Sequence, residues 1–171
     1  IYASTPNDVI YDDYGIKNPV VIDNTGIWRD EKSLSVHIKS GASKVILTAP
    51  GKDNVKNIVY GINEDEIKKE DQIISAASCT TNAIVPILKV INDKFIINNG
   101  HIETVHAYTN DQNLIDNFHK KDRRGRGAPL NMVITSTGAV NAVAKALPEL
   151  DGKLTGNAIR VPTPNVSLAI L

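Results

Sequence analysis

The chain has 171 residues, of which 42% are hydrophobic, so it can bury a core as one large domain or two small ones. Its 19 Lys and Arg balance its 19 Asp and Glu, which excludes the charge signature of a nucleic-acid or membrane-surface partner. No apolar run reaches the roughly 20 residues of a membrane-spanning helix. One cysteine excludes an internal disulfide, and no Cys/His cluster has zinc-site spacing, so we expect a reducing, cytoplasmic compartment and no metal.

Four short apolar runs in the first half of the chain are typical of buried strands. A stretch with helical spacing, Arg29 to Ser40, separates the first run from the second. Short apolar strands that alternate with helical stretches predict a parallel sheet of the α/β class. A charged surface helix or turn is expected at Glu64 to Glu70. The four runs are Val20–Asp23, Lys44–Thr48, Ile58–Tyr60 and Ile73–Ile74.

The pattern changes after residue 78, where we place a domain boundary. Two amphipathic helices are expected, from Asn82 to Phe95 and from Thr137 to Leu147. Between them lies an irregular basic loop, Asp116 to Gly127. The expected strands, which indicate an antiparallel or mixed sheet of the α+β class, are His101–His106, Ala158–Val161 and Val166–Leu171. Because proteins seldom end on an unpaired apolar strand, we expect the sequence to belong to a longer polypeptide.

The only cysteine, Cys79, lies in the stretch Ser75-Ala-Ala-Ser-Cys-Thr-Thr-Asn82. An isolated cysteine is most often a small buried hydrophobe. This one follows an apolar run directly and precedes a helical pattern. The N-terminus of a helix favours a thiolate, which is the nucleophilic form of cysteine. The surroundings of Cys79 therefore favour a chemical role over a packing role.

A cysteine nucleophile needs a base or a cation beside it, and the chain has four histidines. We expect His37 on the surface of a charged helix, His101 in a turn, and His119 in solvent or facing a phosphate. His106 ends an apolar strand, where catalytic side chains tend to lie, although a packed or turn role is its commoner interpretation when taken alone. Paired with Cys79, it would form a thiolate–imidazolium pair that attacks a carbonyl. The spacing leaves open whether that carbonyl belongs to an amide, an ester or an aldehyde.

Guanidinium and hydroxyl groups gather in the second half of the chain. Arg123-Arg-Gly-Arg126 and Arg160 supply the guanidiniums. Ser136-Thr-Gly138 precedes a predicted helix, so its hydroxyls and backbone N–H groups form a ready anion site. Each of these residues could instead be a helix cap or part of a solvated basic loop. Together they indicate a phosphorylated substrate. The hydroxyls near turns and helix starts are those of Thr80, Thr109, Ser136 and Thr137.

At these residues the chain resembles a known family. Ser78-Cys79-Thr-Thr-Asn82 resembles the active-site motif of phosphorylating glyceraldehyde-3-phosphate dehydrogenase. Asn24-Thr-Gly26 and Thr48-Ala-Pro50 are similar to the turns of its nucleotide domain. The resemblance covers essentially the whole chain. Its further motifs are Thr104-Val-His-Ala-Tyr-Thr-Asn-Asp-Gln112, Arg123–Arg126, Ser136–Ala139, Pro148-Glu-Leu-Asp-Gly-Lys-Leu-Thr-Gly156 and Arg160-Val-Pro-Thr-Pro-Asn-Val166.

The resemblance implies an oxidoreductase of glycolysis and gluconeogenesis. Cys79 would be the nucleophile that forms a thiohemiacetal with glyceraldehyde 3-phosphate. His106 would raise the thiolate fraction and act as the base during hydride transfer to NAD. Inorganic phosphate would then cleave the thioacyl enzyme to give 1,3-bisphosphoglycerate.

The resemblance also implies the binding residues. A homotetramer is the family's usual assembly. Residues for the phosphate of the substrate would be Thr109, Asp111 and Arg160. Residues for the attacking phosphate would be Ser78, Thr80, Arg124, Thr137 and Gly138. Residues for the cofactor would be Thr25, Gly26 and Thr48.

The domain organisation implied is α/β followed by α+β. Residues 1–78 would be the C-terminal part of a Rossmann-type dinucleotide-binding domain, and residues 79–171 a catalytic domain with a mixed sheet and helices. The Gly-rich fingerprint and the ribose-binding acid of such a domain are absent, so the choice between NAD and NADP rests on the family alone. Ala83 replaces the second cysteine that many members carry. About half of the family's usual length is missing.

The sequence alone leaves two alternative functions open. Erythrose-4-phosphate dehydrogenase uses the same cysteine and histidine but hydrolyses the thioester; Thr109-Asn-Asp111 and Ser136-Thr-Gly138 are more typical of the phosphate-using enzyme. A non-catalytic structural component of a larger assembly is the second alternative, supported only by the missing segments.

Overall fold

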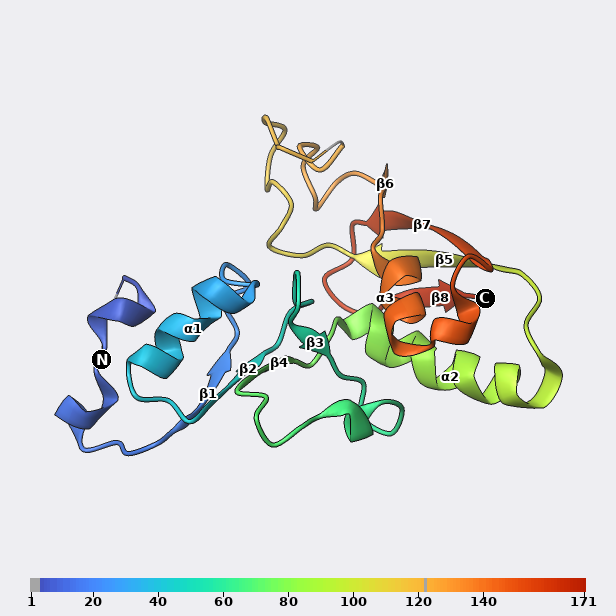
Figure 1. Cartoon of the computed structure of the whole chain (residues 1–171). Coiled ribbons are helices and arrows are strands. Elements are labelled where there is room, and N and C mark those ends of the chain that lie inside the picture. The colour runs from blue at the N-terminus through green and yellow to red at the C-terminus, as the bar shows by residue number, and fades with distance from the viewer. Residues whose placement is uncertain (1–3, 122) are drawn as a thin grey trace. The chain divides into compact units, whose positions relative to one another are not determined.

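A computed structural model of the chain describes residues 4–121 and 123–171 (Figure 1). The chain divides into two compact units, residues 1–89 and residues 90–171, and each is described here by itself. The division lies inside helix α2 (Cys79–Phe95), so the boundary near residue 78 stays a prediction.

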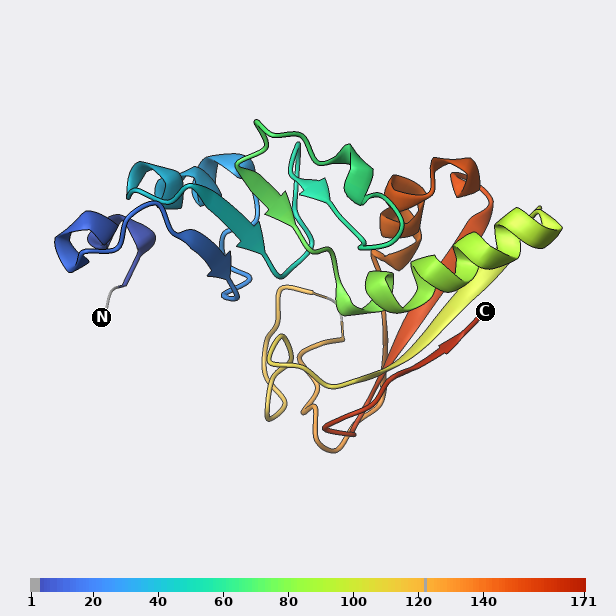
Figure 2. The same cartoon turned by 90° about the horizontal axis from the view of Figure 1, so that it is seen from below.

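The first unit is built on a four-stranded sheet with the order β1-β2-β4-β3. All three neighbouring pairs are parallel, which confirms the parallel sheet expected from the short apolar runs. Its strands, drawn as arrows in Figures 1 and 2, are β1 (Val20–Asp23), β2 (Lys44–Leu47), β3 (Lys56–Asn57) and β4 (Ile73–Ser75).

Helix α1 (Glu31–Lys39) packs against this sheet and supplies its core. Asp30 caps the helix, because its carboxylate accepts a hydrogen bond from the Ser33 N–H at 2.9 Å. Leu34 on the buried face of α1 is fully inaccessible. It packs in one cluster with buried side chains of the sheet and its loops, namely Val45, Leu47 and Val55.

The second unit contains a mixed sheet with the order β6-β7-β5-β8. β5 and β7 are parallel over their whole lengths, whereas β6 and β8 join the two outer sides antiparallel. This confirms the mixed sheet with helices that was expected for the second half. The strands are β5 (Gly100–Ala107), β6 (Val133–Thr135), β7 (Leu154–Val161) and β8 (Leu168–Ile170).

Helix α3 (Ala139–Ala146) lies against β7 in the second unit (Figure 1). Gly156 makes this close approach possible. A Cβ at that position would lie 2.8 Å from a methyl carbon of Val140 and 2.9 Å from the carbonyl oxygen of Ile102. The short 3₁₀ helices of the chain are Pro6–Asp8, Tyr11–Tyr14, Glu64–Glu66 and Pro148–Leu150.

Several predicted boundaries were wrong. The third strand is Lys56–Asn57 and not Ile58–Tyr60, because the Asn63 side chain accepts a hydrogen bond from the Val59 N–H at 2.8 Å and turns the chain away. Helix α2 begins at Cys79, three residues before the predicted start. Strand β6 was missed, since three residues are too few for a clear alternation. β7 begins at Leu154 and is twice as long as predicted.

Candidate active site

Cys79 is the first residue of helix α2 and its side chain is exposed. The short connection from β4 contains Ala77 with φ of 59°, a left-handed conformation that is strained for a residue other than glycine. Ser78 caps the helix: its hydroxyl accepts a hydrogen bond from the Thr81 N–H at 3.0 Å. The Thr80 hydroxyl lies 4.0 Å from the Cys79 sulfur. The strand-to-helix junction that the sequence indicated around the cysteine is therefore present.

Asn82 holds the turn that presents Cys79. Its side-chain amide donates hydrogen bonds to the carbonyl oxygens of Ala76 and Ser78, each at 2.8 Å. These bonds tie the first turn of α2 back to the end of β4. In the sequence Asn82 belongs only to the motif around Cys79, and nothing in its spacing pointed to this supporting role.

Thr25, Gly26 and Thr48 lie together at the carboxyl ends of β1 and β2. The Thr25 N–H and hydroxyl both donate to one oxygen of Asp23, at 2.8 and 2.6 Å. The Thr48 hydroxyl donates to the side chain of Asn24 at 3.0 Å. Gly26 has φ of 66°, and a Cβ there would meet no atom within 4 Å. In open parallel sheets, ligands bind at this end of the strands.

The prediction that His37 lies on the surface was wrong. The residue is buried, and its Nε2 lies 3.4 Å from an oxygen of Asp23, while its Nδ1 lies 3.1 Å from the Tyr11 hydroxyl. Burial raises the pKa of the Tyr11 hydroxyl, and the charge of Asp23 raises it further. His37 thus supports the carboxylate of Asp23, which accepts the hydrogen bonds of the Thr25 turn.

In the second unit, His106 lies near the carboxyl end of β5 beside Arg160 of β7. The Arg160 Nη1 lies 2.9 Å from the His106 Nδ1, 3.0 Å from the Ala107 carbonyl oxygen and 3.2 Å from the Thr109 hydroxyl. The same Nδ1 is 2.7 Å from the Ala107 oxygen. Three of the predicted residues, His106, Thr109 and Arg160, are therefore brought together.

We infer the position of the proton on the His106 ring from the shorter of the two contacts at Nδ1. The Ala107 carbonyl oxygen can only accept, so an unprotonated Nδ1 at 2.7 Å would set two lone pairs against each other. The two hydrogens of the Arg160 Nη1 have acceptors in Ala107 and Thr109. We therefore place the proton on Nδ1 and the lone pair of the neutral ring on Nε2, the atom that can act as a base.

Asp111 and Arg124 form an ion pair through the Asp111 Oδ2 and the Arg124 Nη1. Lys121 also donates to that carboxylate, at 3.0 Å. The Arg124 Nε donates to the hydroxyl of Thr135, at the end of β6, at 3.2 Å. Thr135 was not selected from the sequence, because a buried threonine at a strand end carries no pattern of its own.

The remaining pair, Thr137 and Gly138, begins helix α3. Gly138 is the N-cap residue, and the Thr137 hydroxyl accepts a hydrogen bond from the Ala139 N–H at 3.1 Å. The sequence allowed this turn to be either a helix cap or an anion site. The bond from the Ala139 N–H to the Thr137 hydroxyl is a contact of the helix-cap kind.

The ion pair makes stability depend on pH. Burial raises the pKa of the Asp111 carboxyl, but the hydrogen bond from Lys121 and the charge of Arg124 outweigh it, so the pKa lies below its ordinary value. A depressed folded-state pKa stabilises the protein above the unfolded value of about 3.9 and loses that effect as the pH falls further. We expect Asp111→Asn to lower the urea midpoint at pH 7 and to differ less from wild type at pH 3. An equal difference at both values would contradict this.

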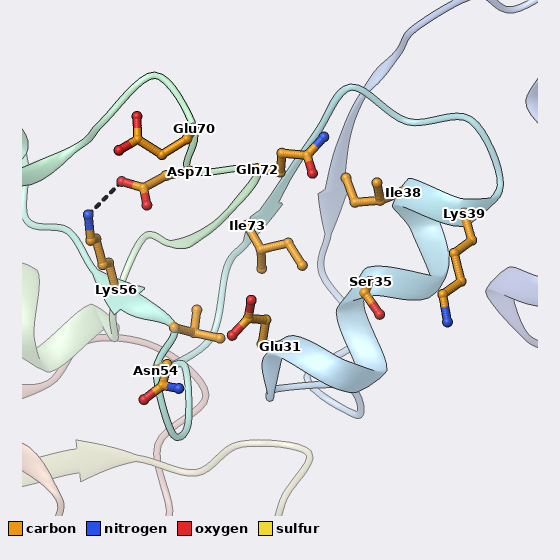
Figure 3. A pocket seen from close by; sticks show the side chains of 11 residues that line it. Glu31, Ser35, Ile38, Lys39, Asn54, Lys56, Glu70, Asp71, Gln72 and Ile73 are labelled. Carbon is orange, nitrogen blue, oxygen red and sulfur yellow. Dashed lines mark hydrogen bonds and ion pairs between the residues drawn. The ribbon is translucent and has the colours of Figure 1, made fainter.

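Each unit also has a hollow on its surface. One, of about 310 Å³, is bordered by Tyr108, Thr109 and Leu114 in the second unit. The other, of about 300 Å³ in the first unit, lies between α1 and the segment before β4, with the Lys56–Asp71 ion pair of 2.6 Å on its wall (Figure 3). None of the residues predicted from the sequence lines this second hollow.

Over residues 4–121 and 123–171, no three His, Cys, Asp or Glu side chains gather as a metal site. Within the same part of the chain, no helix combines the length and the apolar character needed to cross a membrane.

The fold and the site define a two-unit α/β protein with an exposed cysteine at a helix N-terminus in one unit and a histidine–arginine pair on a mixed sheet in the other. The chain belongs to the glyceraldehyde-3-phosphate dehydrogenase family. A family model described as "Glyceraldehyde 3-phosphate dehydrogenase, C-terminal domain" matches residues 78–171, more than half of the chain.

Curated relatives agree with this family. The chain is 67% identical to a glyceraldehyde-3-phosphate dehydrogenase-like protein of Pseudomonas aeruginosa (strain UCBPP-PA14), over 100% of the chain and 37% of that protein. It is 51% identical to the chloroplastic glyceraldehyde-3-phosphate dehydrogenase GAPA1 of Arabidopsis thaliana, over 89% of the chain and 38% of that protein. It is 50% identical to glyceraldehyde-3-phosphate dehydrogenase 1 of Bacillus subtilis (strain 168), over 89% of the chain and 46% of that protein. The chain thus spans less than half the length of these relatives.

Proposed function

We propose that this chain forms the central part of an NAD-dependent enzyme that converts glyceraldehyde 3-phosphate and inorganic phosphate into 1,3-bisphosphoglycerate through a cysteine thioacyl intermediate. The observation that carries the proposal is Cys79, exposed at the first position of α2 in a chain of this family. The family's relatives named above are all dehydrogenases of this type or like it, so the erythrose-4-phosphate alternative is not favoured.

The first step is attack of the Cys79 thiolate on the aldehyde carbon. The N–H groups at the start of α2 have no partner within the helix, and with the helix dipole they favour the thiolate. A C–S bond forms while the C=O π bond breaks, and the carbonyl oxygen takes up the proton that the Cys79 thiol gave up on ionising, which makes it the hydroxyl of a thiohemiacetal. The main-chain N–H of Cys79 supports this oxygen while it is negatively charged.

The second step needs a base, and we assign it to the Nε2 of His106. Because Nδ1 donates to the Ala107 carbonyl oxygen, the lone pair of the neutral ring is on Nε2. Nε2 takes the proton of the thiohemiacetal hydroxyl while the hydride leaves the same carbon, which leaves a thioester on Cys79. NAD, when bound, accepts that hydride.

The carboxyl ends of β1 and β2 fit part of a nucleotide site. Thr25 is fixed by Asp23, Thr48 offers a hydroxyl on the neighbouring strand, and the left-handed turn at Gly26 has open space where a side chain would be. These residues would orient the cofactor from one side. We propose NAD rather than NADP by family relationship.

The third step is attack of inorganic phosphate on the thioester, in which the C–S bond breaks and the Cys79 thiolate leaves. We propose that Arg160 and Thr109, which are hydrogen-bonded to each other, bind the phosphate of the substrate. The resemblance places Asp111 in the same group. The groups proposed for the attacking phosphate are those of Ser78, Thr80, Arg124, Thr137 and Gly138.

Residues 1–78 are proposed to be the C-terminal part of a Rossmann-type dinucleotide-binding domain, followed by the catalytic domain at 79–171. The order β1-β2-β4-β3 leaves β1 at one edge of the parallel sheet. Val20 and Ile22 of this strand are 56% and 60% exposed, which is unusual for apolar residues of a parallel sheet. Further strands and helices of the full-length protein would cover them.

A homotetramer in the cytoplasm is proposed for the assembled enzyme. One apolar residue from each strand of the mixed sheet shares a row on the same face, in the order Ile134, Ile159, Val105 and Leu168. Ile134 and Leu168, at its two ends, are 56% and 57% exposed. A continuous apolar row of this kind is typical of a surface that a second subunit covers.

The enzyme assay with and without inorganic phosphate tests the proposed reaction. We expect the full-length protein to reduce NAD with glyceraldehyde 3-phosphate and to turn over repeatedly only when phosphate is present, with an acyl phosphate as product. Repeated turnover at the same rate without phosphate would contradict the proposal, because hydrolysis would then be removing the acyl group.

A further inference from the structure

The guanidinium of Arg124 is held from two sides. Arg124 is only 8% exposed, although it belongs to an irregular loop. Its Nε donates to the Thr135 hydroxyl at 3.2 Å, and its Nη1 pairs with the Asp111 carboxylate. Since the guanidinium is planar, two contacts at different nitrogens fix both the position and the tilt of the group. No described residue accepts a hydrogen bond from Nη2, so its two N–H groups remain as donors beside the second N–H of Nη1.

Asp111 fits the role of a clamp better than that of a phosphate ligand. Its carboxylate is shared between Arg124 and Lys121, so it carries the negative charge that both cations face. A carboxylate repels a phosphate and has no hydrogen to donate to it. Asp111 can therefore support a bound anion only by positioning Arg124 and Lys121.

Thr135 connects this clamp to the mixed sheet. Thr135 is buried and pairs in register with Ala158 of β7. Arg160 is two residues further along β7 and therefore on the same face, in one row with His106 of β5. Diagonal neighbours of this kind are roughly 7–8 Å apart, so the anchor of Arg124 is close to Arg160.

Thr135 also stands directly before Ser136-Thr-Gly138, the turn proposed for the attacking phosphate. The residue that anchors Arg124 is thus two positions from Thr137. The second guanidinium, Arg160, instead contacts Thr109. This connectivity associates Arg124 with the attacking phosphate rather than with the phosphate of the substrate.

We propose that Thr135 and Asp111 are positioning residues that clamp the guanidinium of Arg124, so that its Nη2 faces the inorganic phosphate that attacks the thioacyl enzyme. The inference rests on the proposed function. It adds Thr135 to the residues that the reaction needs and gives Asp111 a different role from that of Thr109 and Arg160.

Thr135→Val and Thr135→Ser in the full-length enzyme test the clamp. Valine keeps the shape but leaves the buried Nε without an acceptor, whereas serine keeps the hydroxyl. We expect valine to raise the KM for inorganic phosphate by about ten-fold, the scale of one hydrogen bond to a charged group. The KM for the aldehyde and the single-turnover rate of NADH formation, which precedes phosphate attack, should stay within about two-fold. Serine should restore the phosphate KM.

Asp111→Asn provides a second variant, since it removes the ion pair from the other side of the guanidinium. It too should raise the phosphate KM with little change in the single-turnover rate, and thermal unfolding will show whether each variant is folded. The inference is overturned if both Thr135→Val and Asp111→Asn leave the phosphate KM unchanged, if serine behaves like valine, or if the KM for the aldehyde rises instead. If the wild type itself turns over without phosphate, the proposed function fails first, and the clamp has no phosphate to serve.

Discussion

Cys79→Ser is expected to reduce dehydrogenase activity by at least about a thousand-fold, because the oxygen nucleophile stays protonated where the sulfur ionises. The position at the start of α2 favours a thiolate, but a hydroxyl is too weak an acid for the same helix terminus to ionise it. The substitution keeps the size of the side chain, so the helix cap by Ser78 and the fold should persist. Steady-state NADH formation with glyceraldehyde 3-phosphate measures the effect.

Alkylation provides the control for this variant. Cys79 is the only cysteine of these 171 residues and is exposed, so after treatment with iodoacetamide peptide mapping should find the label at position 79 in the wild type and not in the Cys79→Ser variant. Far-UV circular dichroism and thermal unfolding should match between the two proteins. If a folded variant without label at position 79 kept most of the wild-type rate, Cys79 would not be the nucleophile and the thioacyl mechanism would be wrong.

Strands β1, β2 and β4 of the parallel sheet could be predicted, because each is a short apolar run. The third strand could not, since its Lys56–Asn57 pair has no apolar character and its place is set by pairing with β4. The burial of His37 also escaped prediction. It depends on Asp23 and Tyr11, which lie 14 and 26 residues away along the chain. Long-range contacts of polar side chains have no periodicity that a sequence could display.

The candidate site likewise contains residues that could be predicted from the sequence and contacts that could not. Residue types and motif resemblance selected His106, Thr109 and Arg160, and the structure brings the three together around the guanidinium of Arg160. The same reasoning grouped Asp111 with the phosphate ligands, whereas its carboxylate is occupied by cations. Thr135 had no signal at all, because its importance comes from the path of a loop that returns to the sheet 11 residues after Arg124. Local chemistry can thus be predicted more readily than the contacts that orient it.

His106→Asn is expected to slow NADH formation in the first turnover by roughly 10²–10⁴-fold, the usual contribution of a positioned general base. Asparagine can still donate its side-chain N–H to the Ala107 carbonyl oxygen, as the Nδ1 of the histidine does, so the end of β5 should keep its structure. What the variant lacks is the lone pair of Nε2. Stopped-flow measurement of the NADH burst isolates this step from phosphate attack and product release.

His101→Asn is the matched control, because it changes the other histidine of the same strand. Five positions separate the two residues, so they lie on opposite faces of the sheet, and His101 contacts Thr155 and Asn157 instead. The control should retain the burst rate within about two-fold. An equal loss in both variants would mean that damage to β5, and not removal of the base, slows the reaction. A normal burst in His106→Asn would exclude His106 as the base of hydride transfer, because the asparagine side chain has no basic nitrogen that could replace Nε2.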